Sequence, residues 1–124
     1  MERLVDLDAA AREIESRRAE WERAGFTVGP LTWRDHAEPW PQSLRMDRAS
    51  ILDPDSVGVS LDYNDSPAAL IVMYRGGWAD VDIVDFETER GVALDGTDLT
   101  SPEAFGDLLV QAVDRIRHSM HGRD

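Results

Sequence analysis

Three aspartates stand close together in the second half of the chain, at Asp80, Asp82 and Asp85. Carboxylates two residues apart on a strand project from the same face, where they could bind a hard cation such as calcium. Such a site needs several oxygen atoms to converge, and an intervening strand would hold the next acidic candidate, Asp62, apart from them. The sequence also lacks the D-x-[DN]-x-[DN]-G pattern of a calcium loop. We therefore expect a solvated sheet face and no bound metal.

The histidines are the other candidates for chemistry. His36 lies beside Asp35 and close to Glu38, so it could act as a general base. No recognisable nucleophile or oxyanion hole accompanies it, and a loop histidine is the simpler interpretation. His118 and His121 lie near arginines toward the end of an expected helix, where positive charge complements the helix dipole. These residue types predict neither enzyme activity nor a cofactor.

Glycine, cysteine and overall composition exclude further classes. Gly76 and Gly77 join two expected strands rather than a strand and a helix, so they do not form a phosphate-binding loop. The chain has no cysteine, which excludes disulfides and thiol nucleophiles. All 13 basic residues are arginine, as in GC-rich bacterial genomes. No run of about 18 apolar residues could span a membrane, and the charged first residues do not resemble a signal peptide. We expect a cytoplasmic protein.

Two helices are expected to frame the domain. The spacing of apolar residues predicts a helix over residues 8–24, capped by Asp6 or Asp8 and ended by Gly25. A capping box at Thr100–Glu103 begins the second helix, because apolar residues recur at helical spacing after it.

Strands are expected between these helices, over residues 57–64, 68–75 and 78–86. A short strand near residue 92 would follow. Residues 26–33 and 43–49 are weaker candidates, and whether they join the same sheet stays open. We predict one α+β domain over residues 1–124. Its antiparallel meander sheet of four to six strands has an N-terminal and a C-terminal helix packed on one face.

Two turns set the expected register. A two-residue hairpin over Gly76–Gly77 places Arg75 opposite Trp78. A four-residue turn after Tyr63 places that residue opposite Ala68. Because side chains alternate along a strand, the inner face then collects Val57, Val59, Leu61, Leu70, Val72, Tyr74, Ala79, Val81 and Ile83. The outer face collects Ser60, Asp62, Ala69, Ile71, Met73, Arg75, Trp78, Asp80 and Asp82.

The expected outer face resembles a protein interface, with an apolar centre inside a ring of carboxylates. Residues 35–100 hold 14 Asp and Glu against 4 Arg, in a chain of net charge −12. Such a surface attracts basic proteins and repels nucleic acid. The predicted partner is a basic protein, with neither nucleic acid nor a membrane as a partner. The residues expected to contact it are Asp62, Ile71, Met73, Trp78, Asp80 and Asp82.

The segment Tyr74–Asp85, YRGGWADVDIVD, and the helix at each end of a meander resemble the small acidic immunity proteins of bacterial polymorphic-toxin systems. The resemblance implies a protein that binds and neutralises a cognate toxin, often a basic nuclease or another enzyme that acts in the cytoplasm. It also implies that Asp62, Trp78, Asp80 and Asp82 contact that toxin.

Three other functions stay open. A type III-like secretion chaperone is also small, acidic and α+β. A structural subunit could use the face around Trp78 to form a homodimer, so the protein would be a monomer or a homodimer. A small-ligand or hydrolytic domain could place its pocket at the Trp33–Trp40 loop, with His36, Asp35 and Glu38 as its polar groups.

Overall fold

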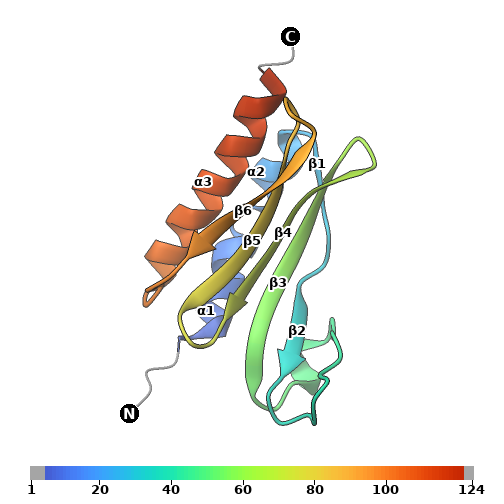
Figure 1. Ribbon diagram of the computed structural model, residues 1–124. Helices are drawn as coiled ribbons and strands as arrows, with labels where there is room; N and C mark the ends of the chain where they lie inside the picture. Colours follow the sequence, from blue (N-terminus) through green and yellow to red (C-terminus); the bar gives the residue numbers. More distant parts are fainter. Residues whose placement is uncertain (1–4, 122–124) are drawn as a thin grey trace.

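The structure is a computed structural model that describes residues 5–121, and it confirms the predicted α+β fold (Figure 1). The helices within these residues are α1 (Leu7–Glu15), α2 (Arg18–Arg23) and α3 (Pro102–His121), with one 3₁₀ turn, η1 (Arg48–Ser50). The strands are β1 (Phe26–Val28), β2 (Thr32–Asp35), β3 (Pro54–Tyr63), β4 (Ser66–Tyr74), β5 (Trp78–Asp85) and β6 (Arg90–Gly96). All six strands belong to one antiparallel sheet, and the helices pack on one of its faces.

The order of strands across the sheet is β1–β3–β4–β5–β6, and β2 pairs with β3 on the same side as β1. The weak candidate at residues 26–33 therefore does join the sheet, as two short strands along β3. The candidate at residues 43–49 forms no strand, and its Arg45 makes an isolated bridge to Trp33.

The predicted N-terminal helix is divided into α1 and α2. At the break, the Ser16 hydroxyl and the Arg17 guanidinium both donate to the carbonyl of Glu13, at 2.9 and 2.8 Å. In a continuous helix this carbonyl would accept the N–H of Arg17. That N–H donates instead to the carbonyl of Ile14, and the helix turns. Gly25, with φ of +103°, follows α2 as expected.

The N-termini of the two longer helices, α1 and α3, are each capped by a side chain. Asp6 caps α1, and its carboxylate accepts the N–H of Ala9 at 3.1 Å. The hydroxyl of Ser101 accepts the N–H of Ala104 at 3.1 Å at the start of α3. The capping residue is therefore Ser101, and the capping box expected over Thr100–Glu103 is wrong, because the third residue after Ser101 is Ala104, which has no side-chain acceptor.

The core lies between the helices and the inner face of the sheet. Strands β3 and β5 contribute the buried side chains that the sequence predicts, Val57, Val59, Leu61, Ala79, Val81 and Ile83. The expected apolar stripe of α3 is also buried and consists of Phe105, Leu108, Leu109, Ala112, Val113 and Ile116. Removing this apolar area from water is the main source of stability.

Strand β4 faces the opposite way to the prediction. Ile71 and Met73, expected on the outer face, are both 0% exposed and belong to the core. Leu70, Val72 and Tyr74, expected inside, lie on the outer face, because they pair with the outward residues of β5. A slip of one residue turns every side chain of a strand to the other face.

The turn before β4 is shorter than expected, but on this side of the strand a bulge causes the slip. Asn64 and Asp65 have φ values of 50° and 63°, so a two-residue turn joins β3 to β4 instead of the expected four-residue turn. A bulge between Leu61 and Asp62 then shifts the pairing by one residue.

The turn after β4 is longer than expected. Three residues separate the paired Tyr74 and Trp78, so Arg75 does not stand opposite Trp78. Gly77 has a φ of +93°, which suits the last position of a three-residue hairpin loop. Its N–H donates to the carbonyl of Tyr74 at 3.1 Å.

Candidate functional site

The sheet face opposite the helices is uncovered in the part of the chain that the structure describes (Figure 1). We name it the open face, and it carries the side chains of Arg34, Ser60, Asp62, Leu70, Val72, Tyr74, Trp78, Asp80, Asp82 and Val84. They stand in rows because paired residues of antiparallel strands project to the same side. Leu70 is 48% exposed and Trp78 is 45% exposed, so large apolar side chains here face water.

Four of the six residues predicted to contact a partner lie on the open face, namely Asp62, Trp78, Asp80 and Asp82. The expected outward positions of Ile71 and Met73 are wrong, because both side chains are fully buried. Leu70 and Val72 take their place as the apolar centre, and Tyr74 extends it. The expected core positions of these three residues are wrong, because the register of β4 differs from the expected one by one residue.

An aromatic pair stands at one end of the open face. The rings of Tyr74 and Trp78 are stacked, with centroids 4.0 Å apart and planes inclined by 12°. The Tyr74 hydroxyl donates to the Asp80 carboxylate at 3.4 Å. Burial, and then the negative charge of Asp80, raise the pKa of Tyr74. The stacked pair thus places the Trp78 ring next to a tyrosine that is hydrogen-bonded to a carboxylate.

A hollow of about 400 Å³ lies toward the other end of the open face. Its lining is mostly apolar and includes Leu70, Val84 and Gly91. Asp62 from β3 and Asp82 from β5 also line it, on either side of β4. The hollow is open to solvent and has the volume of a small-ligand pocket.

The carboxylates of the open face lack the arginine partners that several other carboxylates have. Elsewhere, arginines pair with Asp8, Glu13, Glu15, Glu38, Asp53 and Asp55, at distances from 2.8 to 3.6 Å. Among the described side chains, Asp62 and Asp82 have no ion pair, and Asp80 has only the hydroxyl of Tyr74. The open face therefore keeps negative charge that the fold does not neutralise.

The buried position of Asp35 separates it from His36. The Asp35 carboxylate accepts the N–H of Leu52 at 2.9 Å and those of Ala37 and Asp53 at 3.0 Å. These three hydrogen bonds lower the pKa of Asp35, and the one from Leu52 has the largest effect. Asp35 thus holds the segment between β2 and β3 in place.

The other polar groups of the Trp33–Trp40 loop have partners of their own. His36 lies with its Nδ1 3.4 Å from a carboxylate oxygen of Asp55. Glu38 accepts a hydrogen bond from Ser43 at 2.9 Å, and this bond lowers the pKa of Glu38. The three groups considered for catalysis therefore do not share one site.

The segment between β2 and β3 exposes four large apolar side chains, Trp40, Leu44, Met46 and Leu52. Trp40 is 82% exposed and Leu52 is 84% exposed. The backbone below them is held by the bridge between Trp33 and Arg45 and by Arg48, whose guanidinium lies 5.1 Å from the centre of the Trp33 ring. This segment is a second surface with the composition of an interface.

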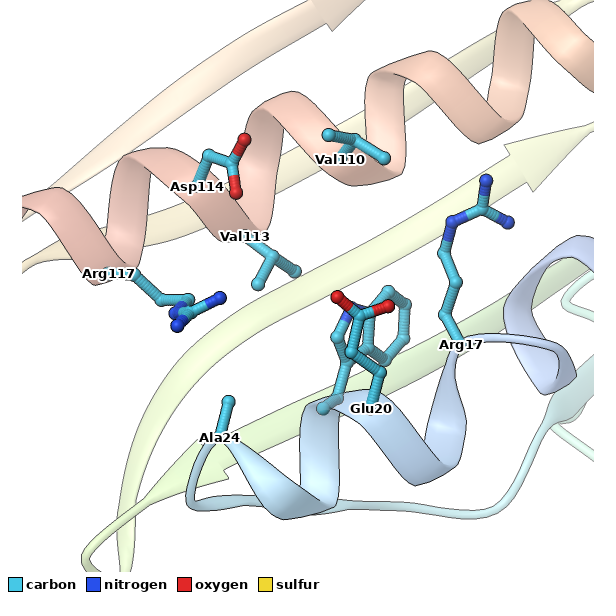
Figure 2. A pocket seen from close by; sticks show the side chains of 8 residues that line it. Arg17, Glu20, Ala24, Val110, Val113, Asp114 and Arg117 are labelled. Carbon is cyan, nitrogen blue, oxygen red and sulfur yellow. The ribbon is translucent and has the colours of Figure 1, made fainter.

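A narrow cleft between α2 and α3 has both charged and apolar walls (Figure 2). Its charged side chains are Arg17, Glu20, Asp114 and Arg117, and its volume is about 40 Å³. That volume admits water but no substrate. Positive and negative groups alternate around it, so the cleft offers no single charge to a ligand.

Residues 5–121 contain no group of three or more His, Asp or Glu that could hold a metal ion. No helix in the described part of the chain is long and apolar enough to cross a membrane. Comparison with known protein families, curated proteins and solved structures finds no match for this chain. Its function has to be inferred from the open face itself.

Proposed function

We propose that the protein is a non-enzymatic binding protein whose open face docks on a basic protein. The observation that supports this function is one uncovered sheet face with an apolar centre and carboxylates that no arginine neutralises. An apolar centre within a polar rim is the usual anatomy of an interface. Opposed potentials speed encounter with a basic partner and reject partners of the wrong charge.

A cytoplasmic bacterial toxin is the partner that we favour, in keeping with the resemblance to immunity proteins. A toxin that acts on nucleic acid needs a basic surface to bind phosphates. An acidic face laid over that surface would both bind the toxin and block it. The residues that the resemblance implicates, Asp62, Trp78, Asp80 and Asp82, all stand on the open face.

A second copy of the same chain is a poorer occupant of the open face. In a symmetric dimer the same patch meets itself, so the acidic face that carries Asp62, Asp80 and Asp82 would be brought against an equally acidic face. Such like-charge contacts are unfavourable.

The test of the proposed function replaces Asp80 and Asp82 together by arginine. Both side chains are exposed, so we expect the fold to be retained. Attraction becomes repulsion at the interface, and affinity for the partner isolated from the native host should fall by at least about a hundredfold. Calorimetry with the purified partner, at low and high salt, measures the loss. Wild-type binding should itself weaken as salt rises.

The matched control replaces Asp107 and Asp114 of α3 by arginine. This variant has the same net charge as the first, but its changes lie on a helix that packs against the other face of the sheet. We expect nearly unchanged binding. Wild-type affinity in the Asp80 and Asp82 variant would show that the open face is not the docking surface. Equal losses in both variants would show that only net charge matters.

A further inference from the structure

We propose that the hollow lined by Asp62 and Asp82 receives an arginine side chain of the basic partner. The proposal rests on the proposed function and specifies which chemical group the open face recognises. The hollow measures about 400 Å³, which is in the lower part of the range of small-ligand pockets. It is therefore suited to one long side chain rather than to a whole secondary-structure element.

Apolar groups make up most of the lining of the hollow that the methylene groups of the arginine would contact. The accessible side chains among them are those of Pro67, Leu70 and Val84, because Ala68, Ala69 and Ile83 are buried in the core. Leu70 is nearly half exposed in the free protein, so its side chain has apolar surface still to be covered. The methylene groups of arginine cover such surface well while the charged end stays at the rim.

Two carboxylates stand on opposite sides of the hollow. Asp82 of β5 lies two strand spacings from Ser60 of β3, and Asp62 is two residues further along β3, so the two aspartates stand roughly 12 Å apart. Neither carboxylate has an ion pair with another side chain within residues 5–121, and Ser60 adds a hydroxyl to the lining. A guanidinium at this place meets negative potential from both sides, and Asp82 offers two acceptor oxygens to its fork.

The apolar lining favours arginine over lysine. A cation that enters the hollow loses part of its hydration, and a guanidinium is more weakly hydrated than an ammonium group. The flat guanidinium also packs on apolar surface, which a compact ammonium group does not do. We therefore expect the hollow to discriminate between two side chains of equal charge.

The experiment uses peptides of six arginines or six lysines as probes, with the full-length, isotopically labelled protein followed by NMR. The arginine peptide should shift the amide signals of Leu70, Asp82 and Val84. Asp82→Asn should weaken its affinity on the order of tenfold, because a charge-assisted contact is lost. The matched variant Asp80→Asn removes one negative charge outside the hollow. It should weaken the affinity for the arginine peptide only about twofold.

A third variant, Leu70→Ala, separates apolar contact from charge. Net charge is unchanged, yet affinity for the arginine peptide should fall about fivefold as apolar contact is lost. The lysine peptide should bind more weakly and depend less on Leu70. The amide spectrum of each free variant checks that the fold is intact.

Each outcome has a definite meaning. Equal losses in Asp82→Asn and Asp80→Asn, with no effect of Leu70→Ala, would overturn the arginine hollow and leave an acidic docking face in place. Tighter binding of the lysine peptide would overturn the choice of arginine. Signals that shift only outside the open face would overturn this proposal and the proposed function together.

Discussion

Asp35 and Asp82 show how the surroundings of an aspartate decide its role. Asp35 is only 5% exposed, and three backbone N–H groups replace the water that its carboxylate loses. Asp82 is exposed and has no such donors among the described residues. The first carboxylate is committed to holding a loop, whereas the second remains available to another molecule. The alternation along each strand distinguishes them, because Asp35 is in step with buried Trp33 and Asp82 is in step with exposed Asp80.

We predict that Asp35→Asn lowers the midpoint of thermal unfolding at neutral pH. The N–H donors keep the folded pKa of Asp35 below that of the unfolded chain. The resulting stabilisation is therefore fully present above about pH 4 and is lost as the pH falls through the folded pKa. Circular dichroism melts at neutral pH and in steps down to about pH 2 measure this. The difference between variant and wild type should shrink in acid.

Asp82→Asn is the control for this prediction. It makes the same chemical change at an exposed position, and its effect on the midpoint should be small. A melting midpoint of Asp35→Asn equal to that of the wild type at neutral pH would contradict the structural role of Asp35.

Strand β4 depends on the connections at its two ends for its orientation. Its residues 68–75, AALIVMYR, are apolar almost throughout, so the sequence of the strand itself does not indicate which face is buried. The connections at its two ends do, because a bulge between Leu61 and Asp62 and the three-residue loop that Gly77 ends each shift the pairing by one residue. The open face acquires Leu70 and Val72 from this register.

Substitutions at Ile71 and Leu70 test this register within one strand. Ile71→Asp puts a charge into the core and should cost at least about 4 kcal/mol, which is most of the stability of a small domain. Leu70→Asp faces water and should cost no more than about 1 kcal/mol. Urea unfolding of both variants measures these two losses of unfolding free energy and so tests the register of β4. A folded Ile71→Asp protein beside an unfolded Leu70→Asp protein would restore the register first expected from the sequence.

The elements of this fold were easier to predict from the sequence than their orientations. Apolar and polar residues alternate in β3 and β5, and apolar residues recur at helical spacing in α3. These patterns predict both the type of element and its buried face, and the structure confirms both predictions. The break between α1 and α2 depends on how Ser16 and Arg17 compete for one carbonyl, which no periodicity shows. Asp62, Asp80 and Asp82 were placed correctly because they interrupt apolar patterns. The face of Leu70 could not be predicted in this way, because its neighbours in the sequence are equally apolar.

Negative charge is distributed over the whole molecule more widely than the sequence analysis expected. The central segment holds 14 acidic residues, but several occupy turns and loops, where they accept backbone N–H groups or pair with arginine. The fold makes little use of Asp62, Asp80 and Asp82, and these three share one sheet face with the exposed side chains of Leu70 and Trp78. The open face is thus defined less by its amount of charge than by charge left unpaired around an apolar centre.

Salt should act in opposite directions on stability and on binding. A net charge of −12 repels itself in the compact state, so raising salt to about 0.5 M should raise the unfolding midpoint while it weakens partner binding. The double variant Asp80→Asn with Asp82→Asn should have both effects at low salt, because it removes two negative charges. We expect a midpoint higher by about 2 °C and lost affinity. The midpoint difference should vanish at high salt, where repulsion is already screened. A lower midpoint for this double variant at low salt would mean that the aspartates stabilise the fold, and that their charge is not reserved for a partner.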